Sequence, residues 1–279
     1  MPIMPYTSAQ NRAISDFKSI TSTDSKTAAK WLKASGWEAT AAVNAFYNQS
    51  SSSVAQSPSS KAALNKLFDK YAESAGRDSL EIDQIMPYFN DIGADPAALS
   101  ALVVQEIMKC PEMGSLTREG FVEGWSALGC DTLDKQKKFL ETRTKTLGMP
   151  GNREILKAVY KYAFELCITQ QGQRLVSKEE LVEMWRLLFS PPGLDWRTQN
   201  NNWLELWLEF VQGNSAKAFN RDVWTQTLRF AEETLKDESL SWWSEEASWP
   251  AIIDEFVEWI KERRGNGSTR QDEDEEMEY

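Results

Sequence analysis

The chain has 279 residues, of which 41% are hydrophobic, and its formal net charge is −11. That much apolar side chain can form a packed core, so a globally disordered chain is excluded. The sequence contains no histidine, which removes the commonest general base and every Ser–His or Cys–His nucleophile pair. We therefore expect a protein without catalytic activity, metal or cofactor.

The beginning of the sequence has no apolar run of the signal-peptide type. No stretch approaches the roughly 18 apolar residues of a membrane span. Three widely spaced cysteines, Cys110, Cys130 and Cys167, fit reduced core thiols better than a disulfide framework. These features indicate an intracellular protein.

The acidic excess lies at the C-terminal end of the chain. Residues 1–221 carry 25 acidic and 25 basic side chains, whereas residues 222–279 carry 17 acidic and 6 basic ones. Such an end repels nucleic-acid phosphates and favours a basic protein partner. For Asp272–Glu278 alone, a solvated acidic tail is the better interpretation.

The first 50 residues predict a small helical unit, at 8–48. Helical spacing of apolar residues occurs in Ala9–Ser19, Ser25–Ala34 and Glu38–Tyr47. The uncharged, serine-rich segment Gln49–Ser60 cannot form a core, and it predicts a flexible linker at 49–60.

A larger helical domain is predicted at 61–264, followed by a disordered tail at 265–279. Its helix-start signals are Asp95-Pro96, Asp131, the capping box Ser177–Glu180, Asn220 and Trp249-Pro250. Sustained alternation of apolar and polar residues is absent, so the predicted fold class is all-α.

Three segments, around Leu80, Leu116 and Val176, are similar to EF-hand loops that have lost their ligands. With Leu116 at position 8 of a calcium loop, Pro111 and Met113 fall where oxygen ligands are needed. We expect degenerate helix–loop–helix units that do not bind calcium.

Most of the 12 tryptophans lie at core spacing on predicted helices. Trp185, Trp203, Trp207 and Trp224 are therefore expected in the core. Trp242-Trp243 lies in a polar stretch, where it is either the anchor of a loop or a partner-binding edge. The acids Asp222, Asp254 and Glu255 begin predicted helices, where the helix dipole favours them with or without a binding role.

Three C-terminal segments resemble the end of the defective-in-cullin-neddylation (DCN-like) family: Arg221–Trp224, Glu245–Pro250 and Ile253–Glu258. Members of this family share a PONY (potentiating neddylation) domain, and the resemblance covers roughly residues 61–262. The N-terminal unit, with Gly36-Trp37 and Asn44-Ala45-Phe46, resembles the ubiquitin-associated (UBA) domain of many members.

The resemblance implies a co-ligase for cullin neddylation. Such a scaffold holds a cullin C-terminal domain and the N-acetylated neddylation conjugating enzyme together, without a covalent intermediate of its own. It also implies that the UBA domain can bind ubiquitin or the ubiquitin-like modifier, and we expect the protein in nucleus and cytoplasm. The alternative is a calcium-independent EF-hand-like scaffold for another basic protein.

The family's residues map onto three sets of positions in this sequence. The cullin-binding set is Asp222, Ser248, Asp254 and Glu255, with Ser248 where the family has alanine. The pocket for the N-terminal methionine of the conjugating enzyme consists of Ile85, Ala97, Ala101, Val104, Met108, Leu116, Cys167, Met184 and Leu187. The ubiquitin-like binding loop contains Gly36 and Trp37.

Overall fold

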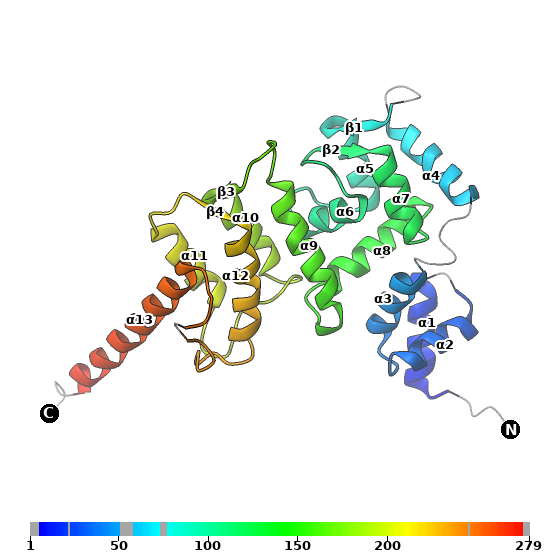
Figure 1. Cartoon of the computed structure of the whole chain (residues 1–279). Coiled ribbons are helices and arrows are strands. Elements are labelled where there is room, and N and C mark those ends of the chain that lie inside the picture. The colour runs from blue at the N-terminus through cyan, green and yellow to red at the C-terminus, as the bar shows by residue number, and fades with distance from the viewer. Residues whose placement is uncertain (1–5, 22, 51–57, 73–76, 245, 276–279) are drawn as a thin grey trace. The chain divides into compact units, whose positions relative to one another are not determined.

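The computed structural model describes residues 6–21, 23–50, 58–72, 77–244 and 246–275. Helices dominate this part of the chain, and each of its named strands has three residues (Figure 1), which confirms the all-α prediction. The chain divides into two compact units, Met1–Cys167 with Pro191–Leu194, and Ile168–Ser190 with Asp195–Tyr279. Among the described residues, no helix is long and apolar enough to cross a membrane.

Three short helices open the first unit: α1 (Ser8–Thr21), α2 (Ser25–Ala34) and α3 (Ala39–Ser50). Asp24 caps α2, because its Oδ1 accepts the N–H groups of Lys26 and Thr27 at 2.8 and 3.0 Å. Phe17 is fully buried and packs edge-on against Phe46, with 5.7 Å between the ring centroids. The predicted three-helix bundle is confirmed.

The predicted linker and tail fall partly outside the described residues. Helix α3 reaches Ser50 and α4 begins at Pro58, and the structure does not describe residues 51–57. Helix α13 (Ala251–Glu275) continues past residue 265, the expected start of the tail, and residues 276–279 are not described. The linker at 49–60 and the tail at 265–279 stay predictions.

The rest of the first unit is a helical assembly around an aromatic core. Its elements are α4 (Pro58–Tyr71), β1 (Ser79–Glu81), α5 (Ile82–Ile92), α6 (Leu99–Met108), β2 (Ser115–Thr117), α7 (Arg118–Ala127), α8 (Leu133–Thr146), the 3-10 helix η1 (Pro150–Asn152) and α9 (Arg153–Leu166). In the core, the indole N–H of Trp125 donates to the hydroxyl of Tyr88 at 2.7 Å, and that hydroxyl donates to Gln136 Oε1 at 3.0 Å. These buried polar groups are thereby satisfied.

Short antiparallel strand pairs join the helix–loop–helix units. Leu80 on β1 lies opposite Leu116 on β2. In the second unit, Val176 on β3 (Leu175–Ser177) lies opposite Phe219 on β4 (Ala218–Asn220). The three predicted EF-hand-like segments are confirmed, and Phe219 marks a fourth. Only residues 214–217 separate its strand from the preceding helix, too few to suggest a calcium loop in the sequence.

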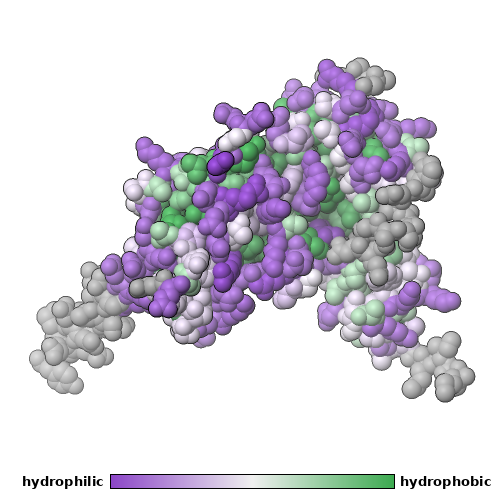
Figure 2. Space-filling model, viewed as in Figure 1, coloured by the Kyte–Doolittle hydropathy of each residue, from purple (hydrophilic) through white to green (hydrophobic). Residues whose placement is uncertain are grey.

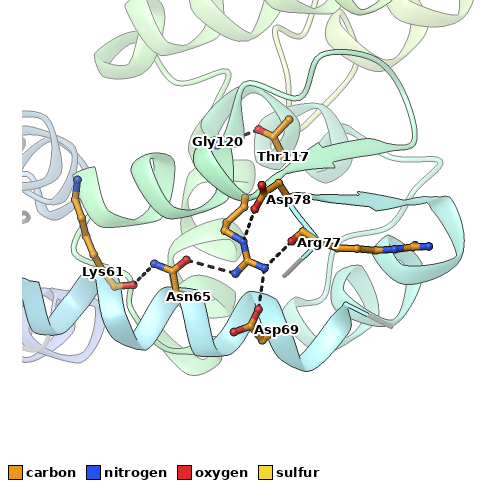
Figure 3. A network of polar contacts seen from close by, with 8 residues as sticks. Lys61, Asn65, Asp69, Arg77, Asp78, Thr117 and Gly120 are labelled. Carbon is orange, nitrogen blue, oxygen red and sulfur yellow. Dashed lines mark hydrogen bonds and ion pairs between the residues drawn. The ribbon is translucent and has the colours of Figure 1, made fainter. Parts of the chain in front are cut away.

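The guanidinium of Arg118, the first residue of α7, contacts residues of α4 and of the segment that leads into β1; Figure 3 shows Asn65, Asp69 and Asp78 of this network. Its Nε donates to Asp78 Oδ1 at 3.1 Å, and its Nη2 contacts Asp69 Oδ1 at 2.8 Å and the carbonyl of Arg77 at 2.6 Å. Asn65 Oδ1 accepts from Nη1 at 3.4 Å. The guanidinium of Arg118 is thus bound by carboxylate, amide and carbonyl oxygens, which are the types of oxygen that bind the metal in a calcium loop.

The second unit is formed by β3, β4 and the helices α10 (Lys178–Leu188), α11 (Trp203–Gly213), α12 (Arg221–Thr234) and α13. The predicted capping box is present at the start of α10, where Ser177 and Glu180 exchange hydrogen bonds. Five tryptophans in this unit are at most 1% exposed: Trp185, Trp196, Trp203, Trp207 and Trp224. The predicted core position of four of them is confirmed, and Trp196 joins them.

Two predicted helix starts are wrong. Helix α6 begins at Leu99 and not directly after Asp95. The Asp95 carboxylate accepts the backbone N–H of Ala97 at 2.9 Å, so Asp95 forms a turn instead of a helix cap. Helix α8 is capped by Thr132 rather than Asp131, since the Thr132 hydroxyl accepts the N–H of Lys135 at 3.4 Å. Helix α6 thus starts after Ala98 without a side-chain cap, and α8 uses the hydroxyl of the residue next to the predicted cap.

Candidate functional site

Asp222 lies in the first turn of α12 and its side chain is exposed. The helix begins here because Asn220 Oδ1 accepts the N–H of Val223 at 3.0 Å. The carboxylate therefore sits at the positive end of the helix dipole, and it faces solvent.

A second acidic pair begins α13. Asp254 is half-buried and Glu255 is exposed. The helix starts after Pro250, whose carbonyl accepts the N–H of Ile253 at 2.8 Å. Asn214, which precedes β4, donates its Nδ2–H to Glu255 Oε2 at 3.0 Å. This bond holds the first turns of α13 beside the segment that leads into α12, and the two helices pack against each other.

Two adjacent tryptophans anchor the loop between α12 and α13. Trp242 packs edge-on against Phe230, with 5.4 Å between centroids, and donates its indole N–H to the carbonyl of Asp237 at 3.0 Å. Trp243 donates its indole N–H to Asp254 Oδ1 at 3.1 Å. These contacts support the anchor interpretation for both, and Trp243 also touches an acid of the candidate site.

An apolar pocket of about 210 Å³ lies in the first unit between α5, α6 and β2. Four residues predicted for a pocket line it: Ile85, Ala101, Met108 and Leu116. Ile82, Met86 and Met113 also line it and are 53%, 42% and 49% exposed, so the apolar lining continues onto the surface. The face in Figure 2 is largely hydrophilic with limited hydrophobic areas. An apolar pocket whose lining continues onto the surface is typical of a binding site.

The pocket lining includes one buried amide. Gln105 is 9% exposed and donates from Nε2 to the carbonyl of Ala101 at 3.1 Å. This bond uses a donor of the amide, so Oε1 can accept a hydrogen bond from a ligand. The pocket is therefore an apolar cavity with one amide acceptor in its lining.

The Gly36-Trp37 loop of the N-terminal bundle has both residues in the left-handed region, with φ of 63° and 69°. This conformation is uncommon for a residue with a side chain. The half-buried Trp37 ring meets the ring of Tyr6 edge-on at 5.4 Å, and Lys33 Nζ lies 5.6 Å from the Tyr6 centroid. The rings of Tyr6 and Trp37 and the ammonium group of Lys33 thus lie together at this loop.

Comparison with known proteins places the chain in a family. It is 33% identical over 272 residues to defective in cullin neddylation protein 1 of Pyricularia oryzae, an alignment that covers 93% of this chain and 96% of that protein. The chain belongs to the defective-in-cullin-neddylation family. Proteins of the same name match from Yarrowia lipolytica, at 33% identity over 71% of this chain and 78% of the relative, and from Saccharomyces cerevisiae, at 25% over 92% and 96%.

Two family models match separate parts of this DCN-like chain. The cullin binding family matches residues 135–259, and the UBA-like domain matches residues 11–53. The UBA-like match begins within α1 and includes all of α2 and α3. The cullin binding match contains the beginning of α12, the following loop and the beginning of α13.

The cullin-binding residues implied by the DCN-like family all lie in the second unit. Asp222 and Asp254 occupy the first turns of α12 and α13, Glu255 follows Asp254, and Ser248 is exposed in the intervening loop. We call these four residues the acidic face.

The other residues implied for the DCN-like pocket lie outside the lining described above. Ala97 is exposed in the turn before α6, Val104 is fully buried within α6, and Cys167 is buried at the end of α9. Met184 and Leu187 are half-buried on α10, in the second unit.

Sequence reasoning did not identify Ile82, Met86 and Met113. A signal was present on α5, where Ile82, Ile85, Met86 and Phe89 already form one apolar face and the buried Tyr88 and Ile92 add a second apolar side.

Proposed function

We propose that this chain is a cullin neddylation co-ligase, a scaffold that holds a cullin and the neddylation conjugating enzyme together. Family membership and the cullin binding match carry this proposal. Holding the two partners in a reactive orientation lowers the barrier by supplying proximity, which is worth up to roughly 7–11 kcal/mol. No acid, base or nucleophile of the scaffold is needed for that gain.

The acidic face is the proposed binding site for a cullin C-terminal domain. The exposed Asp222 and the half-buried Asp254 lie in the first turns of two helices that pack against each other, and their negative charges complement a basic protein surface. Ser248 adds an exposed hydroxyl in the loop between these two helices.

The apolar pocket is the proposed site for the N-acetylated N-terminal methionine of the conjugating enzyme. Its volume of about 210 Å³ and its apolar lining suit one long thioether side chain. Acetylation replaces a charged ammonium by a neutral amide, which is far easier to desolvate. Gln105 Oε1 offers an acceptor for that amide.

The cysteines are poorly suited to carry the modifier. Burial raises the pKa of Cys110 and of Cys130 to about 12, and Cys167 is buried as well. Because the thiolate is the nucleophile, such thiols react slowly at neutral pH. This supports transfer directly from the conjugating enzyme to a cullin lysine.

The UBA-like bundle is proposed as an additional module for ubiquitin or the ubiquitin-like modifier. The UBA-like match supports this proposal, and it includes the loop with the exposed Gly36 and the half-buried Trp37. This module is not required for the two-partner scaffold proposed above.

A reconstituted neddylation assay with the purified full chain tests the proposal. The wild type should accelerate modification of a cullin, and Asp222→Lys and Asp254→Lys should each abolish most of the acceleration. Glu179→Lys is the matched control, because Glu179 is an exposed acid in the first turn of α10 in the same unit. If the wild type does not accelerate the reaction, or if all three variants behave alike, the proposal fails.

A further inference from the structure

Trp242 and Trp243 are neighbours, but their indole N–H groups serve different purposes. Trp242 donates to a backbone carbonyl inside its own loop, that of Asp237. Trp243 donates to a carboxylate of the acidic face, Asp254 Oδ1, at 3.1 Å. Only the second bond joins the loop to a group that a partner would touch.

The ring of Trp243 lies along α13 and is held from two sides. Lys261 Nζ lies 4.1 Å from the ring centroid, which is a close cation–π contact. Asp254 and Lys261 are seven residues apart, about two helical turns, so they share one side of the helix. The Trp243 indole therefore lies between the side chains of Asp254 and Lys261, with its N–H toward Asp254.

A neutral donor orients a carboxylate without neutralising it. An ion pair would fix Asp254 but cancel the charge that attracts a basic partner. The indole N–H instead occupies Oδ1 and leaves the negative charge in place, with Oδ2 available to a cation. The side chain is then ordered before binding, which reduces the entropy lost on association.

We propose that Trp243 is a positioning residue of the acidic face, which holds the Asp254 carboxylate in the orientation that accepts a cation of the partner. The inference rests on the proposed function, because it takes a cullin C-terminal domain as the partner. We expect the effect of Trp243 in the dissociation rate. The association rate depends mainly on charge, whereas the lifetime of the complex depends on the geometry of the acceptor.

The test compares Trp243→Phe with Trp242→Phe in the full chain, by surface plasmon resonance against a cullin C-terminal domain. Each change removes one indole N–H and retains an aromatic ring. Trp243→Phe should accelerate dissociation about tenfold, because one hydrogen bond to a charged group is lost. Its association rate should stay unchanged, since no charge changes. Trp242→Phe should alter neither rate, and equal effects of the two variants would overturn the proposal.

A double-variant experiment separates positioning from general damage to the fold. If Trp243 acts through Asp254, then Trp243→Phe should have no further effect in an Asp254→Ala background. A full additional loss there would contradict the proposal. Asp254→Ala alone tests the proposed binding of a cullin by the acidic face, and unchanged binding would contradict that assignment. If Asp254→Ala weakens binding but Trp243→Phe does not, only the positioning role of Trp243 is wrong.

A spectroscopic measurement reports the hydrogen bond directly. The indole N–H resonance of Trp243 in the ¹⁵N-labelled chain is identified by its loss in Trp243→Phe. Asp254→Ala should shift that resonance and leave the Trp242 resonance in place. An unshifted Trp243 resonance would mean that the bond does not form in solution, and the proposal would be wrong.

Discussion

Gly120 on α7 lies against the backbone carbonyl of Met108 on α6, so closely that a Cβ at Gly120 would lie 2.1 Å from that oxygen. The contact sets the spacing of the two helices, and Met108 lines the apolar pocket. Backbone atoms cannot move aside as the end of a long side chain can. Gly120 therefore connects the packing of α6 and α7 to the shape of the pocket.

Gly120→Ala should destabilise the chain by about 1–3 kcal/mol, because the new methyl group forces α7 away from α6. Gly213→Ala is the control: nothing lies within 4 Å of a Cβ placed at this residue, the last of α11. Urea unfolding measures both variants. A Gly120→Ala variant as stable as Gly213→Ala would show that the two helices separate without cost.

Ala101→Phe should fill the pocket and abolish binding of an acetylated N-terminal peptide of the conjugating enzyme, because Ala101 is a buried lining residue. Ala97→Phe tests the alternative, since the family resemblance includes Ala97 but the structure leaves it exposed and outside the lining. Calorimetry with acetylated and free peptides measures both. Stronger loss with Ala97→Phe would favour the resemblance over the structure.

Arg118→Lys should lower the free energy of unfolding by about 1–2 kcal/mol, because an ammonium cannot reproduce the fork that reaches Asp69, Asp78 and Asn65. Arg186→Lys is the matched control, since Arg186 reaches its acids only at 3.8 and 4.0 Å. Thermal unfolding of the two variants provides the comparison. Equal midpoints would indicate that the network in Figure 3 contributes little to stability.

The second unit should lose stability in acid through Glu238. Hydrogen bonds from the Thr198 hydroxyl, the Asn200 amide and the Asn201 amide lower the pKa of Glu238 from 4.5 to about 2. A lowered pKa in the folded state means that the contribution is complete above pH 4.5 and is lost as the pH falls towards 2. Glu238→Gln should flatten this part of the pH dependence of the unfolding midpoint, and identical curves for both proteins would contradict it.

Local signals in the sequence determined most helices and the division into a small and a large helical region. The capping box at Ser177–Glu180 and the Asn220 cap act through hydrogen bonds within three residues, so the sequence contains all their partners. The core tryptophans were predictable for a similar reason, because their spacing places them on the buried face of a helix. The acids of the acidic face could be identified from the sequence through the family resemblance.

Only the tertiary structure decided which residues come together across long separations. The pairing of Val176 with Phe219 revealed the fourth EF-hand-like segment, and the exposed Ile82 and Met113 proved to share one pocket. The role of Trp243 likewise depends on how its loop folds back onto α13. Such contacts are set by the packing of whole helices, which no short stretch of sequence specifies, whereas helix caps and apolar spacing are complete within a few turns.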